Sequence, residues 1–251
     1  MDREETPFNR AERAATNVDN TVAFGSTRDL TPPGTVLFVN DPFPHLDSDA
    51  VEPAPVTIGP NCPNPYTTAS LVNISAMSYG ALSNPAARAL SAGAKVVGCW
   101  LNTGEGGLAP AHLLGGADIV YQIGTAKYGV RDGDGNLSDE KLREVAAHEQ
   151  IRMFEIKLSQ GAKPGKGGIL PAIKVTAEIA AIRGIPEGQD SLSPNRHPEI
   201  ASVSDILDMV ERVRQATGKP VGFKTVVGSF GCPQHRSLAC HLYPQIGRAH
   251  V

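Results

Sequence analysis

From Leu71 onward, short apolar runs alternate with longer amphipathic stretches, and this alternation limits the fold more than any other feature of the sequence. Such an order is typical of repeated βα units, in which helices join parallel strands. The expected strands are residues 71–77, 96–101, 151–158 and 221–227. Residues 117–123 form another largely apolar run, whose place in the main sheet the sequence leaves open. We therefore expect the α/β class with a parallel sheet.

Residues suited to begin and end helices lie between the apolar runs. Ser83, Ser138 and Ser204 can each begin a helix, because a serine hydroxyl at that position accepts a backbone N–H of the first turn. Gly98 and Gly218 suit helix ends, where the left-handed conformation is common. The expected helices are residues 84–98, 139–148, 175–182 and 205–217.

The number of βα units is smaller than the chain length suggests. Only about four units follow Leu71, whereas a complete (β/α)8 TIM barrel of about 250 residues has eight. We therefore predict that residues 71–231 form the first half of a TIM barrel, preceded by an irregular N-terminal arm and wrapping segment in residues 1–70. Residues 232–251 lack periodicity, and residues 246–251 resemble the translation of a common sequencing-adapter oligonucleotide. We interpret this tail as non-native; a natural terminus is the alternative.

Charge and composition argue against several classes of partner. The 23 basic and 26 acidic side chains leave a net charge of −3, so we expect no nucleic-acid-binding face. No apolar run approaches the roughly 18 residues needed to cross a bilayer, and the N-terminus lacks the pattern of an export signal. We therefore expect no membrane partner and a cytoplasmic location. The four cysteines have no metal-binding spacing, so we predict no metal site.

Two lysines occupy otherwise apolar strand segments. Lys157 lies between Ile156 and Leu158, and Lys224 follows Phe223. Burying a lysine carries a large desolvation cost unless an anion meets it. A reduced flavin is one such anion. A lysine that reaches water from the end of a strand is the alternative.

Polar, glycine-rich loops follow several expected strands, at residues 75–80, 102–107, 160–168 and 228–229. In parallel barrels such loops surround the ligand; simple tight turns are the alternative. Glu105 lies between glycines and suits proton transfer or hydrogen bonding, unless it is merely solvated. Lys163, Lys166, Lys174 and Arg183 could bind the carboxylates of a small dicarboxylic acid or form a solvated basic face.

Three motifs, in this order, point to a known family. They are residues 73–83 (NISAMSYGALS), residues 102–107 (NTGEGG) and residues 160–165 (QGAKPG). Together they resemble the FMN-binding synthase domain of glutamate synthases, and most closely the stand-alone bacterial proteins related to it. The resemblance extends from about Ala23 to Gly231.

The resemblance implies a β/α barrel in which FMN, reduced by ferredoxin or a pyridine nucleotide, delivers hydride to 2-iminoglutarate formed from 2-oxoglutarate and ammonia. The product is glutamate. Glu105 and Lys157 correspond to catalytic positions near the flavin and the substrate. We predict FMN contacts for Ser75, Ala76, Met77, Ser78, Asn102, Lys157 and Lys224. The positions that hold the dicarboxylate substrate correspond to Gln160, Lys163 and Arg183.

The sequence also departs from the family pattern. Ile169 and Ile173 stand where classical glutamate synthases place polar substrate contacts, which weakens the case for 2-oxoglutarate. The chain has no amidotransferase domain, so glutamine-dependent activity would need a separate subunit. It lacks the family's iron-sulfur cysteines, so no such cluster is expected. No phosphate-binding segment of the DGGTG type follows Gly231, and we therefore expect weak or no FMN binding by this chain alone.

The leading hypothesis is an FMN-dependent oxidoreductase that forms glutamate by reductive amination of 2-oxoglutarate, with the full-length parent carrying the chemistry. One alternative is an FMN-dependent reductase of another small carbonyl or imine substrate. The other is a non-catalytic, truncated fragment.

Overall fold

The computed structural model describes residues 33, 42–49, 51, 54–160 and 167–225. The chain divides into two compact units, residues 1–51 and residues 52–251. In the first unit, the described residues include one 3-10 turn, η1 (Asp47–Asp49), where the Asp49 carboxylate accepts the Leu46 N–H. Most of the predicted arm, Lys163 and the predicted tail lie outside the described residues.

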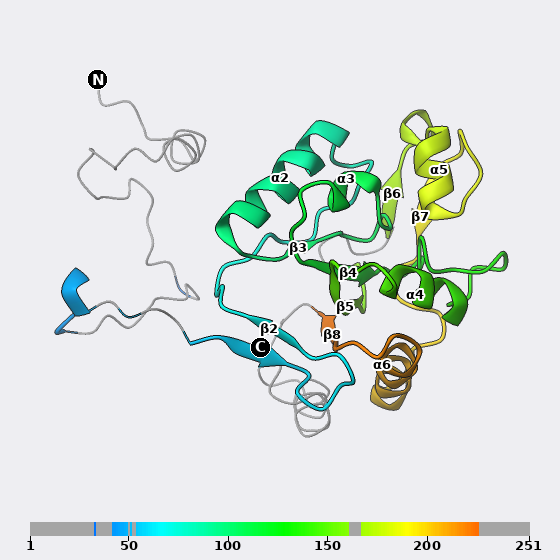
Figure 1. Ribbon diagram of the computed structural model, residues 1–251. Coiled ribbons are helices and arrows are strands. Elements are labelled where there is room, and N and C mark those ends of the chain that lie inside the picture. The colour runs from blue at the N-terminus through cyan, green and yellow to red at the C-terminus, as the bar shows by residue number, and fades with distance from the viewer. Residues whose placement is uncertain (1–32, 34–41, 50, 52–53, 161–166, 226–251) are drawn as a thin grey trace. The chain divides into compact units, whose positions relative to one another are not determined.

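The second unit is built on a parallel sheet of four strands (Figure 1). The strands are β3 (Leu101–Asn102), β4 (Ile119–Ile123), β5 (Ile151–Lys157) and β8 (Val221–Lys224). Their spatial order is β3-β4-β5-β8, so each strand of this sheet pairs with the next one along the chain. The α/β class with a parallel sheet is thereby confirmed, and residues 119–123 belong to that sheet. The strand order is consistent with part of a TIM barrel, and the described strands form an open sheet.

The first predicted strand, residues 71–77, is wrong as a strand. Only Ile74 pairs, in an isolated parallel bridge to Leu101. Leu71 and Val72 are 73% and 81% exposed, so their apolar side chains do not mark a buried strand. The Asn73 side chain, and not a backbone carbonyl, accepts the Trp100 N–H, so regular pairing does not extend to the residues before Ile74.

The helices follow the predicted caps with one correction. Ser83 caps α2 (Asn84–Val97) and Ser138 caps α4 (Asp139–Ala146), while Gly98 ends α2 with φ of 76°. Since α2 runs through Val97, the strand predicted at residues 96–101 shortens to β3. The prediction that Ser204 begins the helix at residues 205–217 is wrong. The remaining helices are α3 (Pro110–Leu113), η2 (Ala172–Lys174), α5 (Ala177–Arg183) and α6 (Val203–Thr217).

The helix α6 begins at Val203, one residue before Ser204, because Ser202 is its N-cap and forms a reciprocal capping box with Asp205. The Ser202 hydroxyl accepts the Asp205 N–H, and the Asp205 carboxylate accepts the Ser202 N–H at 2.7 Å. This exchange satisfies backbone donors that a helix start otherwise leaves unpaired. Gly218 ends the helix as predicted.

Two short antiparallel pairs lie outside the parallel sheet. One joins β1 (Val56–Ile58) to β2 (Tyr66–Thr68), within the segment for which no regular structure was predicted. The other joins β6 (Gly168–Leu170) to β7 (Ser191–Ser193), between β5 and α6 along the chain. The second pair brings Gly168 opposite Ser193, near the ends of β5 and β4 described below.

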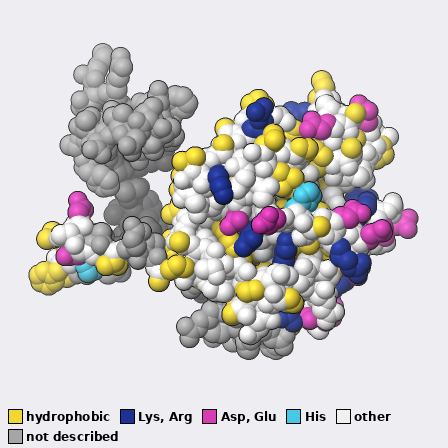
Figure 2. Space-filling view, viewed as in Figure 1, with side chains coloured by type: hydrophobic (Ala, Val, Ile, Leu, Met, Phe, Trp, Pro, Cys, Tyr) yellow, Lys and Arg dark blue, Asp and Glu magenta, His cyan; other side chains and the backbone are white. Residues whose placement is uncertain are grey.

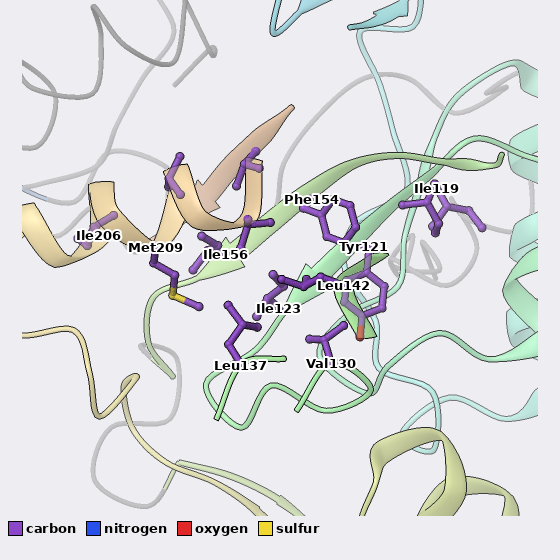
Figure 3. Packing of buried hydrophobic residues seen from close by; sticks show 14 residues of the cluster. Ile119, Tyr121, Ile123, Val130, Leu137, Leu142, Phe154, Ile156, Ile206 and Met209 are labelled. Atoms are coloured by element: carbon purple, nitrogen blue, oxygen red, sulfur yellow. The ribbon is translucent and has the colours of Figure 1, made fainter. Parts of the chain in front are cut away.

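The main hydrophobic core lies between the sheet and the helices α4 and α6 (Figure 3). Tyr121 and Phe154 are fully buried in it, with ring centroids 5.6 Å apart. Because successive strand residues point to opposite faces, Gln122 and Glu155 point away from this core. The sheet therefore has an apolar face toward the helices and a polar face on the other side.

The His112 side chain is expected to make the protein sensitive to acid. Burial lowers the pKa of His112 from 6.5 to about 4. The unfolded chain therefore binds a proton near pH 6.5 before the folded protein does, and folding stability falls as the pH drops from 6.5 toward 4. The expected loss from this group is about 3 kcal/mol.

The measurement is urea denaturation of the wild type and of His112→Asn across this pH range. Asparagine retains an acceptor for the Ala109 N–H, which His112 Nδ1 accepts at 3.1 Å. The wild type should lose more stability than the variant between these two pH values. Parallel pH profiles for the two proteins would show that His112 does not titrate as the structure indicates.

Among the described residues, no helix is long and apolar enough to cross a membrane.

Candidate active site

A cavity of about 220 Å³ lies at the carboxyl ends of the parallel strands. Its lining combines charged, polar and apolar side chains with glycine. The lining residues are Ser78, Ala81, Glu105, Lys157, Gln160, Gly168, Ile169, Leu170, Arg183, Ser191 and Ser193. Basic and acidic side chains are interspersed on the molecular face seen in Figure 2, so neither sign of charge dominates it. Within the described ranges, no group of His, Cys, Asp and Glu side chains is arranged to hold a metal ion.

Three predicted site residues form a closed cluster in this cavity. Lys157 Nζ lies 3.2 Å from Glu105 Oε1 and donates to Gln160 Oε1 at 2.7 Å. Gln160 Nε2 donates to Glu105 Oε2 at 2.6 Å. The Lys157 and Glu105 side chains are 18% and 17% exposed, so the pair is shielded from bulk water but can still be reached by a ligand. We call these residues the Glu105–Lys157–Gln160 cluster.

The backbone explains how residues distant in sequence meet here. Lys157 is the last residue of β5, Gln160 follows three residues later, and Glu105 lies in the loop after β3. Parallel strands bring their carboxyl ends to one edge of a sheet, so the following loops meet there. Gly124, just after β4, makes the room for Glu105, because a Cβ at Gly124 would lie 2.4 Å from the Glu105 Cβ.

The polar face of the sheet carries a second group of hydrogen bonds. Lys224 Nζ donates to Gln122 Oε1 at 3.2 Å, and Asn102 Nδ2 donates to Glu155 Oε1 at 3.0 Å. Both bonds reach across an intervening strand. Burial lowers the pKa of the Lys224 ammonium, and the nearby Glu155 carboxylate opposes that shift. Asn102 and Lys224, for which FMN contacts are predicted, thus lie on the polar face of the sheet.

Gln122 provides the clearest sign that this face could hold a further polar group. Its Nε2 is buried, and no described residue accepts a hydrogen bond from it. A buried donor without an acceptor costs free energy, so such atoms commonly indicate a missing partner. Together with Lys157 and Lys224, Gln122 provides donors that fit the oxygen- and nitrogen-rich edge of an isoalloxazine ring.

The predicted FMN-binding segment Ser75–Ser78 is only partly at the cavity. Ser78 lines the cavity, and its hydroxyl accepts the Glu105 N–H at 3.2 Å. Ser75, Ala76 and Met77 are not among the lining residues. Gly104 explains how the two loops approach each other, because a Cβ there would lie 2.5 Å from the Met77 carbonyl carbon and the Ser78 nitrogen.

Replacement of Gly104 by alanine is expected to destabilise the protein by about 2–4 kcal/mol. The residue has φ of 67°, which costs an L-residue about 1 kcal/mol, and the new methyl group would meet backbone atoms that cannot move aside. Gly98→Ala is the matched control, since Gly98 has φ of 76° but nothing within 4 Å of the added Cβ. Urea denaturation should give a clearly smaller loss for Gly98→Ala. Equal losses would mean that the two loops are not in contact.

Arg183 lies at the cavity but its guanidinium is buried. Nη1 donates to the Ser191 hydroxyl at 2.8 Å and Nη2 to the Tyr79 carbonyl at 3.1 Å, while the Tyr128 ring lies 5.0 Å from the guanidinium carbon. Burial lowers the pKa of Arg183, although the neighbouring Tyr128 and Glu105 oppose that shift. Its Nε has no hydrogen-bond acceptor in the described part of the chain.

The two isoleucines that weakened the case for 2-oxoglutarate differ in position. Ile169 is 51% exposed and lines the cavity. Ile173 is 91% exposed and is not a lining residue. Ile169 is therefore the one of the two that can influence substrate selection directly.

The structure adds Gln122, Thr125 and Ser191 to the residues found from the sequence. Thr125 Oγ1 accepts a hydrogen bond from Gln160 Nε2 at 3.2 Å, and Ser191 binds Arg183. Gln122 could have been found by the reasoning applied to Lys157, because it is a polar residue in the apolar run IVYQI. Thr125 and Ser191 carry no comparable signal in the sequence.

The family of the chain follows from comparisons with known proteins. Residues 37–239 match the family described as a conserved region in glutamate synthase. The glutamate synthase large subunit-like protein YerD of Bacillus subtilis is 36% identical over 271 aligned positions, covering 90% of this chain and 51% of YerD. An archaeal glutamate synthase (NADPH) of Methanocaldococcus jannaschii is 43% identical over 156 positions, covering 61% of this chain and 28% of that protein.

A glutamate synthase large subunit-like protein of Rhizobium meliloti is 34% identical over 155 positions, covering 61% of this chain and 32% of that protein. The chain thus spans about half the length of YerD and about a third of the other two relatives. The matched region includes the three motifs and every residue that lines the cavity. On these grounds the chain belongs to the glutamate synthase family.

Proposed function

We propose that the whole protein is an FMN-dependent oxidoreductase that converts 2-oxoglutarate and ammonia to glutamate. The observation that carries the proposal is the Glu105–Lys157–Gln160 cluster, which lines a cavity at the carboxyl ends of parallel strands. An ion pair at this edge of a β/α sheet is placed where such folds bind ligands. A purely structural ion pair would have no need of an adjoining cavity.

The reaction consumes 2-oxoglutarate, ammonia, a hydride and a proton, and it releases water and glutamate. Ammonia condenses with the keto group of 2-oxoglutarate and releases water, giving 2-iminoglutarate. Addition of a hydride to the imine carbon and a proton to its nitrogen gives glutamate. FMN, when bound, supplies the hydride and is reduced again by an external electron donor.

The residues of this chain have distinct roles in the proposal. Lys157, Lys224 and Gln122 would hold the flavin, and the positive charge of Lys157 would favour its reduced form. Glu105 handles the proton exchanged with the nitrogen of the substrate. Gln160 holds the Glu105 and Lys157 side chains in position, since it forms a hydrogen bond with each of them.

The substrate carboxylates need basic partners. Arg183 and Lys163 are the proposed partners, because both are basic and the Nε of Arg183, a residue that lines the cavity, has no hydrogen-bond acceptor among the described residues. Lys163 lies outside the described residues. Of the two electron donors that the resemblance implies, the Methanocaldococcus jannaschii relative is named for NADPH. We therefore propose a pyridine nucleotide donor, with a separate amidotransferase subunit where glutamine is the nitrogen source.

The second candidate is an FMN-dependent reductase of a less polar substrate. It rests on Ile169, an apolar side chain in the cavity wall. One extra methylene in an apolar pocket is worth only about 1–3 kcal/mol, so Ile169 alone would produce a preference rather than exclusion.

A steady-state assay with the whole protein, FMN, NADPH and ammonia decides between the two candidates. The proposal predicts the highest kcat/KM for 2-oxoglutarate when it is compared with pyruvate and 4-methyl-2-oxopentanoate. A higher value for 4-methyl-2-oxopentanoate would favour the second candidate. Turnover of none of the three would reject the proposed function.

A further inference from the structure

His197 is a fully buried histidine that has no role in the proposed chemistry. Its Nε2 lies 3.0 Å from the main-chain carbonyl oxygen of Lys157, and it has no exposed surface. Its Nδ1 is buried as well, and the described residues offer it no hydrogen-bond partner. The hydrogen bond to the end of β5 is therefore the one polar contact that the described residues give to this imidazole.

The Lys157 carbonyl lies where β5 no longer pairs with β4. The pairing of β4 with β5 ends at Ile123 and Ile156, one residue before Lys157. On the other side of β5, Lys157 still pairs with Lys224. The His197 ring therefore supplies a hydrogen bond to β5 just beyond the end of its pairing with β4.

The proton of the imidazole can be assigned from this contact. A carbonyl oxygen only accepts hydrogen bonds, so Nε2 carries the proton. Burial lowers the pKa of His197, which keeps the ring neutral and leaves Nδ1 unprotonated. The charged groups facing the ring are Glu199, Lys127 and Glu105. Lys127 and Glu199 form an ion pair of 3.0 Å and act on the His197 pKa in opposite directions.

The residues preceding His197 run beside the segment that carries the cluster. The Gln160 N–H donates to the Asn195 carbonyl at 2.9 Å, and Ser159 forms an antiparallel bridge with Arg196. Residues 195–197 thus contact the backbone at both ends of residues 157–160. This contact fixes the spacing between Lys157 and Gln160, whose side chains both bind Glu105.

We propose that His197 is a positioning residue that holds Lys157 in the Glu105–Lys157–Gln160 cluster through its hydrogen bond to the Lys157 carbonyl. The effect of His197 on the flavin rests on the proposed function. Its effect on the position of Lys157 does not. His197 itself lies behind the strand end and is not a catalytic residue.

The first test is the midpoint potential of FMN bound to the whole protein. His197→Phe keeps a ring of similar size and removes the donor, so the potential should shift in the negative direction, as it should in Lys157→Met. In the double variant the shift should equal that of Lys157→Met alone, because His197 acts through Lys157. His197→Gln, which keeps an N–H donor, should restore part of the wild-type potential. Additive shifts in the double variant, or no shift in His197→Phe, would overturn the proposal.

The second test needs no flavin and therefore separates this inference from the proposed function. Lysine ammonium protons held in hydrogen bonds exchange slowly enough to be followed by NMR of the flavin-free protein. The Lys157 signal should persist in the wild type and in His197→Gln, and should exchange about fivefold faster in His197→Phe. His148→Phe, at an exposed histidine, is the matched control and should leave it unchanged. If the protein binds no FMN, the proposed function fails, while an unchanged Lys157 signal in His197→Phe would reject this inference.

Discussion

Replacement of Lys157 by methionine is expected to lower kcat of the whole protein by about 10²–10³-fold, the usual effect of removing one preorganised electrostatic group from a reaction centre. Methionine keeps an unbranched apolar side chain and removes only the ammonium. The Glu105 carboxylate retains its hydrogen bond from Gln160 Nε2, so the variant does not leave that carboxylate without a donor. We therefore expect a folded protein whose reaction is slow. The measurement is steady-state turnover of 2-oxoglutarate with NADPH and ammonia.

Lys95→Met is the control for this prediction. Lys95 lies exposed in the last turn of α2 and contacts no residue of the cluster, so the variant should retain wild-type turnover. FMN content and thermal unfolding should be measured on all three proteins, because a loss of flavin alone would also lower activity. A Lys157→Met protein that turns over within about threefold of the wild type, a difference of less than 1 kcal/mol, would make Lys157 merely structural.

Replacement of Phe154 by alanine is expected to reduce the free energy of unfolding by about 3–5 kcal/mol. Phe154 is fully buried in the middle of β5, and its ring packs against Tyr121 in the core between the sheet and the helices α4 and α6 (Figure 3). Removing the ring takes away its transfer free energy and leaves a cavity that strands on both sides keep open. Such a loss is a large part of the total stability of a typical domain. Urea denaturation followed by circular dichroism measures it.

Phe154→Leu is the matched control, because leucine fills most of the same volume and should cost less than about 2 kcal/mol. The dependence of the unfolding free energy on urea concentration should be the same for both variants, since the folded state exposes the same surface. A loss below about 1 kcal/mol for Phe154→Ala would contradict the burial of Phe154 in the core between the sheet and the helices α4 and α6.

Local rules predicted the helices better than the strands. Ser83, Ser138 and Gly98 act through hydrogen bonds or dihedral angles of their own neighbourhood, and all three are confirmed. Ser204 is wrong as the start of α6 because Ser202, and not Ser204, exchanges hydrogen bonds with Asp205. Residues 71–77 failed as a strand because pairing depends on a neighbouring strand, and only Ile74 finds one.

The site was predictable where chemistry and topology act together. A lysine in an apolar strand and a glutamate between glycines identified Lys157 and Glu105, and the common edge of parallel strands brings them together. The role of Gly104 could not be predicted, since the loop that it contacts is more than twenty positions away in sequence. The role of His197 could not be predicted for the same reason, because its hydrogen-bond partner is a backbone carbonyl forty positions earlier.

The most direct test of the flavin and substrate site is lysine-selective NMR of the whole protein during a titration with FMN. Lys219 is the internal reference, because it lies just before β8 and donates to the Ala146 and His148 carbonyls, at the opposite end of the sheet from the cavity. The account predicts that the Lys157 and Lys224 signals shift together and saturate with the bound flavin while the Lys219 signal stays in place. Saturable FMN binding that shifts Lys219 and leaves Lys157 and Lys224 unmoved would contradict it.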